Sequence, residues 1–162
     1  ASKAFAEEMS RKLDIEVNVA TTSAEAASQA DIICCATIAE TPVFDSRDLR
    51  PGVHINAVGS YKPHVQEVPE EMVLQSRLFV DHRVSALEET GDLIIPIRKE
   101  LMSEDHIVAE IGEVAAGTHA GRVSADDITF FKSVGVAVQD LAAAAVILKR
   151  AEDLGIGSIV DF

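Results

Sequence analysis

A run of apolar residues near the middle of the sequence ends in side chains that can do chemistry. Residues 54–63 read HINAVGSYKP, and the polar part begins at Ser60, directly after Gly59. Two other apolar runs, ADIICCAT and RLFVD, end at Thr37 and Asp81. In parallel sheets, ligands bind in the crevice at the carboxyl ends of the strands. We therefore predict a ligand site built from these strand ends.

The side chains near these ends differ in the chemistry that they can do. A serine hydroxyl does not titrate near neutrality, so Ser60 cannot act as a general base without a partner. His82 follows a strand and is the one histidine that we consider as an acid or base. Glu89 and Asp92 flank Gly91 and are candidates for binding a cationic amine. No two histidines have metal-ligand spacing, so we predict no metal site.

A lysine and a serine precede the last predicted helix. Lys132 lies between Phe131 and Ser133, and we predict that Ser133 is the N-cap of that helix. The N-terminus of a helix also suits anionic or amide groups. Lys132 is therefore a candidate for the site. Alternatively, it forms a structural salt bridge, or its aliphatic chain is buried while its ammonium group reaches solvent.

Hydrophobic periodicity predicts strands that alternate with helices. The expected strands or extended segments are 16–21, 31–37, 53–58, 77–81 and 128–133. The expected helices are 1–13, 23–30, 70–76, 86–93, 95–117 and 134–155, with breaks at Gly91-Asp92 and Pro96 and a stop at Gly155. Continuous apolar runs such as 31–37 indicate strands that are buried on both faces. This order predicts an α/β fold, in which a Rossmann-type parallel sheet is flanked by helices and followed by a long C-terminal helix.

The composition excludes several classes of partner. The chain has 162 residues, of which 48% are apolar and 25% are charged, as is typical of a soluble globular domain. Its formal net charge of −13 would repel nucleic acid and anionic membranes, so we predict no nucleic acid and no membrane as partners. Cys34 and Cys35 are neighbours on a strand and point to opposite faces, so they cannot pair. We expect both to be buried thiols in a reduced, cytoplasmic protein.

Several segments together resemble the ornithine cyclodeaminase/mu-crystallin family. In the family's order and spacing they are ADIICCAT, LRPGVHINAVGSYKPHVQEV, LFVDHRVSALEETGDL, AEIGEVAAG and ITFFKSVGVAVQDLAAA, and the HINAVG and FKSVG parts are the most specific. The resemblance implies NAD or NADP as cofactor and hydride transfer at the α-carbon of an amino acid or imino acid. It also implies a homodimer.

Family members are longer, and this chain resembles their C-terminal half. The sequence contains no GxGxxG, so we expect the fold to be truncated on its N-terminal side, with the first βαβ unit and its glycine-rich motif missing. Residues 1–135 are then a partial NAD(P)-binding Rossmann-like domain. Residues 136–162 are a C-terminal helix that leads back to the substrate-binding and dimerisation domain.

Matched position by position, the resemblance assigns cofactor contacts to two strand ends. Ala36 and Thr37 match the loop beside the cofactor ribose and nicotinamide, and Val58 and Ser60 match the segment that flanks the nicotinamide. At the position of Ser60, ornithine cyclodeaminases carry an aspartate that is their proposed acid/base. This difference argues against cyclisation of ornithine with loss of ammonia.

Three further positions match the family's site. Lys132 and Ser133 match an element that approaches the cofactor from the far side of the cleft, and Glu89 matches an acidic position near the ligand, which we assign to substrate binding.

These assignments leave three functions open. The leading hypothesis is an NAD(P)(H)-dependent oxidoreductase acting on an amino acid or cyclic imino acid, such as a ketimine reductase or an amino-acid dehydrogenase, with Ser60 as the catalytic residue that orients the nicotinamide or the substrate. The alternatives are ornithine cyclodeaminase, a lyase that forms proline and ammonia, and a non-catalytic binding protein like mu-crystallin.

Overall fold

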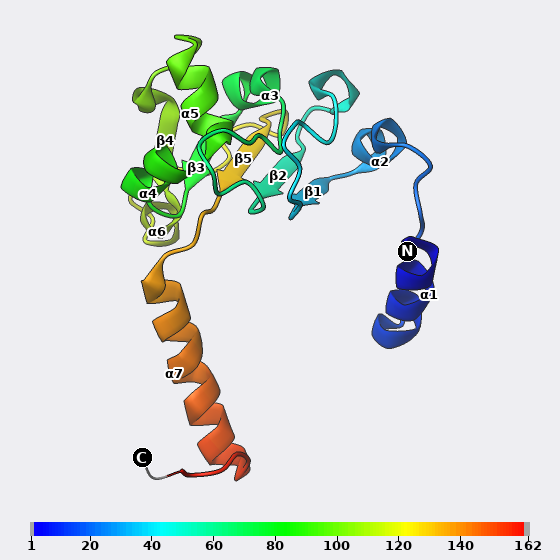
Figure 1. Cartoon of the computed structure of the whole chain (residues 1–162), viewed down its shortest axis with the longest axis vertical. Helices are drawn as coiled ribbons and strands as arrows, with labels where there is room; N and C mark the ends of the chain where they lie inside the picture. Colours follow the sequence, from blue (N-terminus) through cyan, green and yellow to red (C-terminus); the bar gives the residue numbers. More distant parts are fainter. Residues whose placement is uncertain (1, 161–162) are drawn as a thin grey trace.

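Five short strands form one parallel sheet at the centre of the molecule (Figure 1). The structure is a computed structural model, and it describes residues 2–160. The strands lie in the order β1-β2-β5-β3-β4. They are β1 (Ile32–Cys35), β2 (His54–Ala57), β3 (Arg77–Val80), β4 (Ile107–Glu110) and β5 (Thr129–Lys132). Each neighbouring pair is parallel, so all the carboxyl ends lie at one edge, and the predicted α/β class with a parallel sheet is confirmed.

Helices precede, connect and follow these strands. They are α1 (Ser2–Leu13), α2 (Ser23–Gln29), α3 (Glu70–Gln75), α4 (Arg83–Glu89), α5 (Gly91–Arg98), α6 (Ile111–Ala115) and α7 (Ala137–Leu154), with the short 3-10 turns η1 (Ser46–Asp48) and η2 (Glu104–His106). Within residues 2–160, no helix is both long enough and apolar enough to cross a bilayer.

One face of the sheet holds the hydrophobic core. Ile55, Leu78 and Phe130 come from neighbouring strands, point to this face and are fully buried. Helices α3 and α5 cover them with Met72 and Leu93, which belong to the same cluster. Burial of each such side chain stabilises the fold by about 1.5–3 kcal/mol.

The other face of the sheet is only partly covered, and here the sequence-based prediction for 31–37 is wrong. Ile32 of β1 is 62% exposed and Cys34 is exposed, whereas Cys35 is buried. Strand β1 is an edge strand, and no described helix packs on its outer face. The apolar run therefore marks a strand that is buried on one face, not on two.

The strand predicted for residues 16–21 does not form. This segment is extended, but it pairs with no described strand, and the N–H of Val17 donates to Ser10 Oγ at 2.9 Å. An isolated extended segment leaves its backbone groups to solvent, so alternating apolar residues alone do not make a strand.

The helix predicted for 95–117 is interrupted by β4. Ile107 and Ala109 are buried and pair in parallel with Leu78 and Phe79 of β3. The preference of Ile107 and Val108 for a pleated surface, together with a free edge on β3, outweighs the helical spacing of the flanking residues.

The break between α4 and α5 lies at Thr90, not at Gly91-Asp92 or at Pro96. Thr90 ends α4, and its Oγ1 accepts the N–H of Asp92 at 3.3 Å, so the same residue caps both helices. Gly91 is the first residue of α5, and Pro96 lies inside α5. The glycine is needed for close packing, because a Cβ on Gly91 would lie 2.2 Å from the carbonyl oxygen of Val65.

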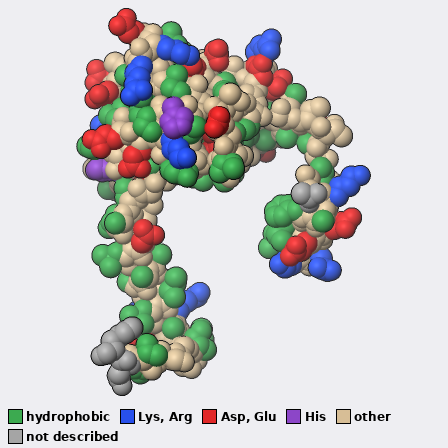
Figure 2. Space-filling view, in the orientation of Figure 1, with side chains coloured by type: hydrophobic (Ala, Val, Ile, Leu, Met, Phe, Trp, Pro, Cys, Tyr) green, Lys and Arg blue, Asp and Glu red, His purple; other side chains and the backbone are tan. Residues whose placement is uncertain are grey.

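The last helix begins later than predicted and ends as predicted. Val136, not Ser133, occupies the N-cap position of α7, and Gly155 ends the helix in the left-handed region with φ 63°. In Figure 1, α1 and α7 project from the same side of the sheet layer, and α7 follows β5 directly. Figure 2 shows hydrophobic side chains along both helices, and no residue of α7 is buried.

The two cysteines should differ in reactivity. Burial, followed by the charges of Glu67 and Asp92, raises the pKa of the Cys35 thiol to about 12. The thiolate is the nucleophile, so Cys35 should resist alkylation at pH 8, while exposed Cys34 should react readily. Iodoacetamide labelling of the native 162-residue chain, read by peptide mass spectrometry, should modify Cys34 alone, and denaturation should expose Cys35. Equal labelling of both native thiols would contradict the structure.

Candidate functional site

A buried carboxylate joins the ends of β1 and β2. Glu67 is fully buried, and its Oε1 accepts the N–H of Thr37. Its Oε2 accepts the N–H of Gly59 at 2.9 Å. One side chain therefore fixes the backbone of both loops that leave the carboxyl edge of the sheet.

These two loops pack backbone against backbone. A Cβ on Gly59 would lie 2.0 Å from the carbonyl oxygen of Thr37 and 2.6 Å from Glu67 Oε1. No side chain fits there, so the glycine after β2 is required by this close approach and not by its backbone angles.

A second buried carboxylate connects this pair of loops to β5. Asp92 Oδ1 accepts the N–H groups of Glu67 at 2.7 Å and of Val68 at 3.2 Å. Its Oδ2 lies 3.1 Å from Nζ of Lys132, and both side chains are 0% exposed. Asp92 was a candidate for binding a cationic amine in a ligand, but the amine that it contacts is that of Lys132.

The ammonium group of Lys132 is not fully satisfied. Its contact with Asp92 is electrostatic, since no described atom accepts a hydrogen bond from Nζ in good geometry. An ammonium has three donors, and leaving them unused in a buried place is unfavourable. Lys132 lies at the last position of β5, so this unsatisfied group belongs to the carboxyl edge.

The hydroxyl of Ser60 belongs to the same network. Ser60 is 1% exposed, and its Oγ donates to the carbonyl oxygen of Val65 at 2.9 Å. Because that bond uses its only proton, Ser60 must accept the hydrogen bond from Thr90 Oγ1 at 3.0 Å. Thr90 is the N-cap of α5, and Asp92 of α5 contacts Lys132. Ser60 and Lys132 therefore belong to one connected network.

A third carboxylate, Asp81, holds the segment that leaves β5. Its Oδ2 accepts Ser133 Oγ at 2.8 Å, the N–H of Val134 at 3.0 Å and the N–H of Gly135 at 2.7 Å. The side chain of Ser133, predicted to cap α7, therefore anchors its own loop to the end of β3 instead.

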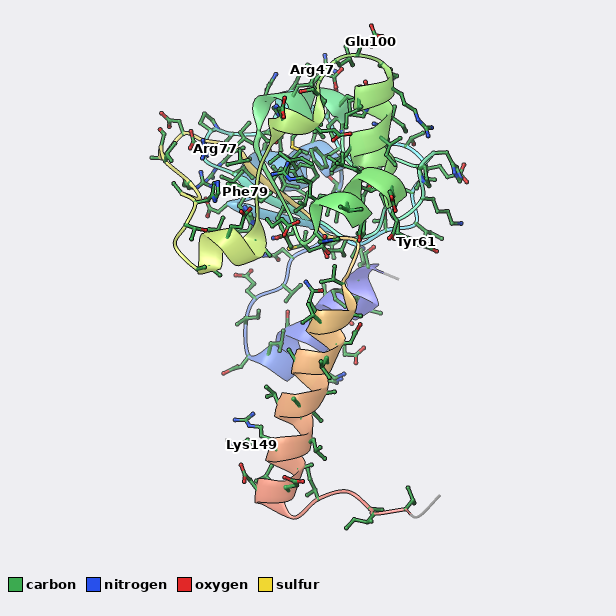
Figure 3. All side chains as sticks on the ribbon, turned by 90° about the vertical axis from the view of Figure 1, so that its left-hand side faces the viewer. Arg47, Tyr61, Arg77, Phe79, Glu100 and Lys149 are labelled. Carbon is green, nitrogen blue, oxygen red and sulfur yellow. The ribbon has the colours of Figure 1, made fainter. Side chains whose placement is uncertain are left out.

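The residues predicted for the site fall into an exposed group and a buried group. Ala36, Thr37 and Val58 are exposed at the ends of β1 and β2, whereas Ser60 and Lys132 are buried beneath them. The nearby Tyr61 is 56% exposed and points away from the core (Figure 3). The structure thus brings these sequence-predicted residues to one edge.

Two other predicted residues stand apart from the network. Glu89 is exposed at the last position of α4. The Nδ1 of His82 lies 2.9 Å from Ser85 Oγ and accepts the N–H of Ser85, so this ring caps the start of α4. Among residues 2–160, no cluster of histidine, cysteine or carboxylate side chains is arranged to hold a metal ion.

Sequence reasoning missed Glu67, the centre of the network. The available signal was a lone acidic residue between apolar Val65 and Val68, shortly after a strand end.

A cavity of about 490 Å³, lined in part by His54, Phe79 and Thr129, lies on the open face of the sheet, away from these strand ends.

The fold is an α/β fold with a parallel sheet, a class of fold in which ligands bind at the carboxyl ends of the strands. The model of the ornithine cyclodeaminase/mu-crystallin family matches residues 1–155. The chain belongs to this family.

Three relatives show how similar the chain is to known members. A Delta(1)-pyrroline-2-carboxylate reductase of Bacillus cereus is 42% identical over 98% of this chain and 49% of its own length. A ketimine reductase mu-crystallin of Rattus norvegicus is 38% identical over 88% of this chain and 42% of its own. The structure of the Thermococcus litoralis Delta(1)-pyrroline-2-carboxylate reductase in complex with NADH and L-proline matches with a TM-score of 0.92 at 41% identity, over 98% of this chain and 49% of that one. The chain therefore spans about half the length of these relatives.

Gly59→Ala should destabilise the fold strongly. The new methyl group would overlap the Thr37 carbonyl and the Glu67 carboxylate, which should lower the free energy of unfolding by about 2–4 kcal/mol. Gly112→Ala is the matched control, because nothing lies within 4 Å of its Cβ position in α6. That control should be neutral or more stable by roughly 0.5–1 kcal/mol. Urea unfolding of both variants measures the difference, and equal midpoints would disprove the close approach.

Proposed function

We propose that the complete natural protein carrying this chain is an NAD(P)H-dependent reductase of imino acids, which also oxidises the corresponding amino acid in reverse. The observation that carries the proposal is the buried network that fixes the ends of β1, β2 and β5 around one edge. The similarity to a reductase whose structure holds NADH and L-proline supports this reaction class.

The strand ends fit the nicotinamide side of a dinucleotide. Exposed Ala36, Thr37 and Val58 offer small apolar groups and backbone at the edge, and we assign them to the cofactor ribose and ring. Lys132 and Ser133 complete the edge on the far side. When bound, the cofactor supplies the hydride, and the protein's part is to hold the ring against the C=N carbon and exclude water.

We assign Ser60 to positioning. Its proton is donated to the Val65 carbonyl and its oxygen accepts from Thr90, so its hydroxyl shapes the loop after β2, where Val58 lies. Glu89 remains the proposed substrate-binding residue of this chain, since its exposed carboxylate is free to approach a cationic amine or iminium.

The sequence lacks the usual motif that binds the pyrophosphate of a dinucleotide. Phosphate groups bind at glycine-rich turns that open helices, and the chain contains no GxGxxG. We therefore expect the 162-residue chain by itself to bind NAD(P)(H) weakly and to turn over no substrate. We further propose that the complete protein is a cytoplasmic homodimer in which the exposed apolar side chains of α7 are covered.

The reaction can be tested directly. The complete natural protein is incubated with NADH or NADPH and a cyclic imino acid such as Δ1-pyrroline-2-carboxylate, and the absorbance of the reduced nicotinamide is followed. We expect oxidation of the cofactor that depends on the imino acid. Proline and ammonia formed from ornithine without net cofactor change would instead show the lyase, and cofactor binding with neither reaction would show a binding protein.

Ser60→Asp tests whether this position can carry the aspartate that ornithine cyclodeaminases have there. The new carboxylate would be buried, would face the Val65 carbonyl and would lie near Asp92, so it should lower the free energy of unfolding by about 2–4 kcal/mol. Ser60→Ala, which removes only the hydroxyl, is the control and should lose about 1–2 kcal/mol. We expect neither variant to cyclise ornithine. Release of ammonia from ornithine by Ser60→Asp would show that a carboxylate at this position can act as an acid or base, and it would contradict our assignment of residue 60 to a buried positioning role.

A further inference from the structure

The buried charges of the molecule gather at the carboxyl edge. Among residues 2–160, the charged side chains in the buried class are Glu67, Asp81, Asp92 and Lys132. Glu67 binds the ends of β1 and β2, Asp81 follows β3, and Lys132 ends β5 beside Asp92.

The three acids act as hydrogen-bond acceptors, as carboxylates do. Both oxygens of Glu67 accept backbone N–H groups, and Asp92 Oδ1 accepts two more. Asp81 Oδ1 accepts the N–H of His82, while its Oδ2 accepts three donors. Oxygens that accept from N–H and O–H donors on all sides behave as ionised groups.

One ammonium does not balance three carboxylates. Lys132 against Glu67, Asp81 and Asp92 leaves a buried charge of −2 at this edge (1 − 3 = −2). The unsatisfied Nζ of Lys132 is a separate sign that the edge is built for another group, since a buried ammonium without a hydrogen-bond partner is unfavourable.

The exposed charges around the edge do not cancel this excess. Lys62 and Glu89 are exposed and of opposite sign, and half-buried Arg83 and Glu110 are also of opposite sign, with the Glu110 carboxylate accepting the N–H of Arg83. His82 is held by Ser85 at the start of α4. Solvent and salt screen exposed charges strongly, whereas buried ones are screened much less.

We propose that this buried negative charge makes the edge favour the oxidised cofactor over the reduced one. The inference rests on the proposed function. The nicotinamide ring is cationic when oxidised and neutral when reduced, so a fixed negative charge beside it stabilises the oxidised form selectively. During reduction of an imino acid, a hydride with its two electrons leaves the ring for the C=N carbon, and a proton from solvent completes the amine. The ring gains positive charge in that step, so the edge favours hydride donation.

The test compares the affinities of the two redox forms. For the complete natural protein, the dissociation constants of NAD+ and NADH, or of NADP+ and NADPH if these bind instead, are measured by titration calorimetry. Glu67→Gln removes one buried negative charge and should raise the ratio of the oxidised to the reduced dissociation constant about 3- to 10-fold. Lys132→Met removes the buried positive charge and should lower the same ratio by a similar factor. Glu104→Gln, an exposed acid in η2, should leave the ratio unchanged.

Glu67→Gln and Lys132→Met should change the ratio in opposite directions, and this distinguishes an effect of charge from a loss of structure. If Glu67 and Lys132 only hold the loops, both redox forms should lose affinity by the same factor in each variant, and that result would overturn the proposal. Asp81→Asn removes one buried negative charge from the end of a different strand, β3, and replaces Glu67→Gln should that variant not fold. If the unmodified protein binds neither redox form, the proposed function is wrong. If it binds both forms, but the ratio of dissociation constants is the same in the variants, only the inference about the buried charge is wrong.

Discussion

The structure depends on hydrogen bonds from backbone N–H groups to buried carboxylates at the ends of parallel strands. Glu67 accepts from Thr37 and Gly59, and Asp81 accepts from Val134 and Gly135. Strands end where their ladder ends, so the N–H groups just beyond them need other partners. A carboxylate meets that need with stronger bonds than a neutral acceptor does, and it fixes the loop that it binds.

The use of buried carboxylates as acceptors places charge in the interior, which is unfavourable unless the charges are compensated. Asp92 and Lys132 compensate each other across 3.1 Å, and backbone donors compensate Glu67. Removing one member of such a buried pair typically costs about 3–5 kcal/mol, because the other charge stays buried without a partner. The apolar packing of Ile55, Leu78 and Phe130 on the same side of the sheet provides the stability that supports this arrangement.

The same architecture explains which surfaces the chain leaves open. Helices α3 and α5 cover the core face, while the outer face of β1 and the sides of α1 and α7 keep apolar groups exposed (Figures 1 and 2). The carboxyl edge lies on the side from which α7 departs, so this helix, of which no residue is buried, begins beside the proposed site.

The sequence by itself determined the local features. Apolar runs in the sequence mark β2 and β5, and Gly155 ends α7 as its left-handed conformation requires. The strand ends at Thr37, Ser60 and Lys132 could also be placed, because an apolar run that turns polar marks the end of a buried strand. These features follow from neighbours along the chain, where the spacing of residue types carries the information.

Only the tertiary structure decided which of these features meet. Glu67 binds Thr37 across 30 residues and Asp81 binds Ser133 across 52 residues, and no local pattern encodes such pairs. Likewise, 16–21 lacked a neighbour and stayed unpaired, whereas 107–110 found one in β3 and became a strand against its helical spacing. A strand and a buried ion pair both need a partner, and the partner's position is set by the whole fold.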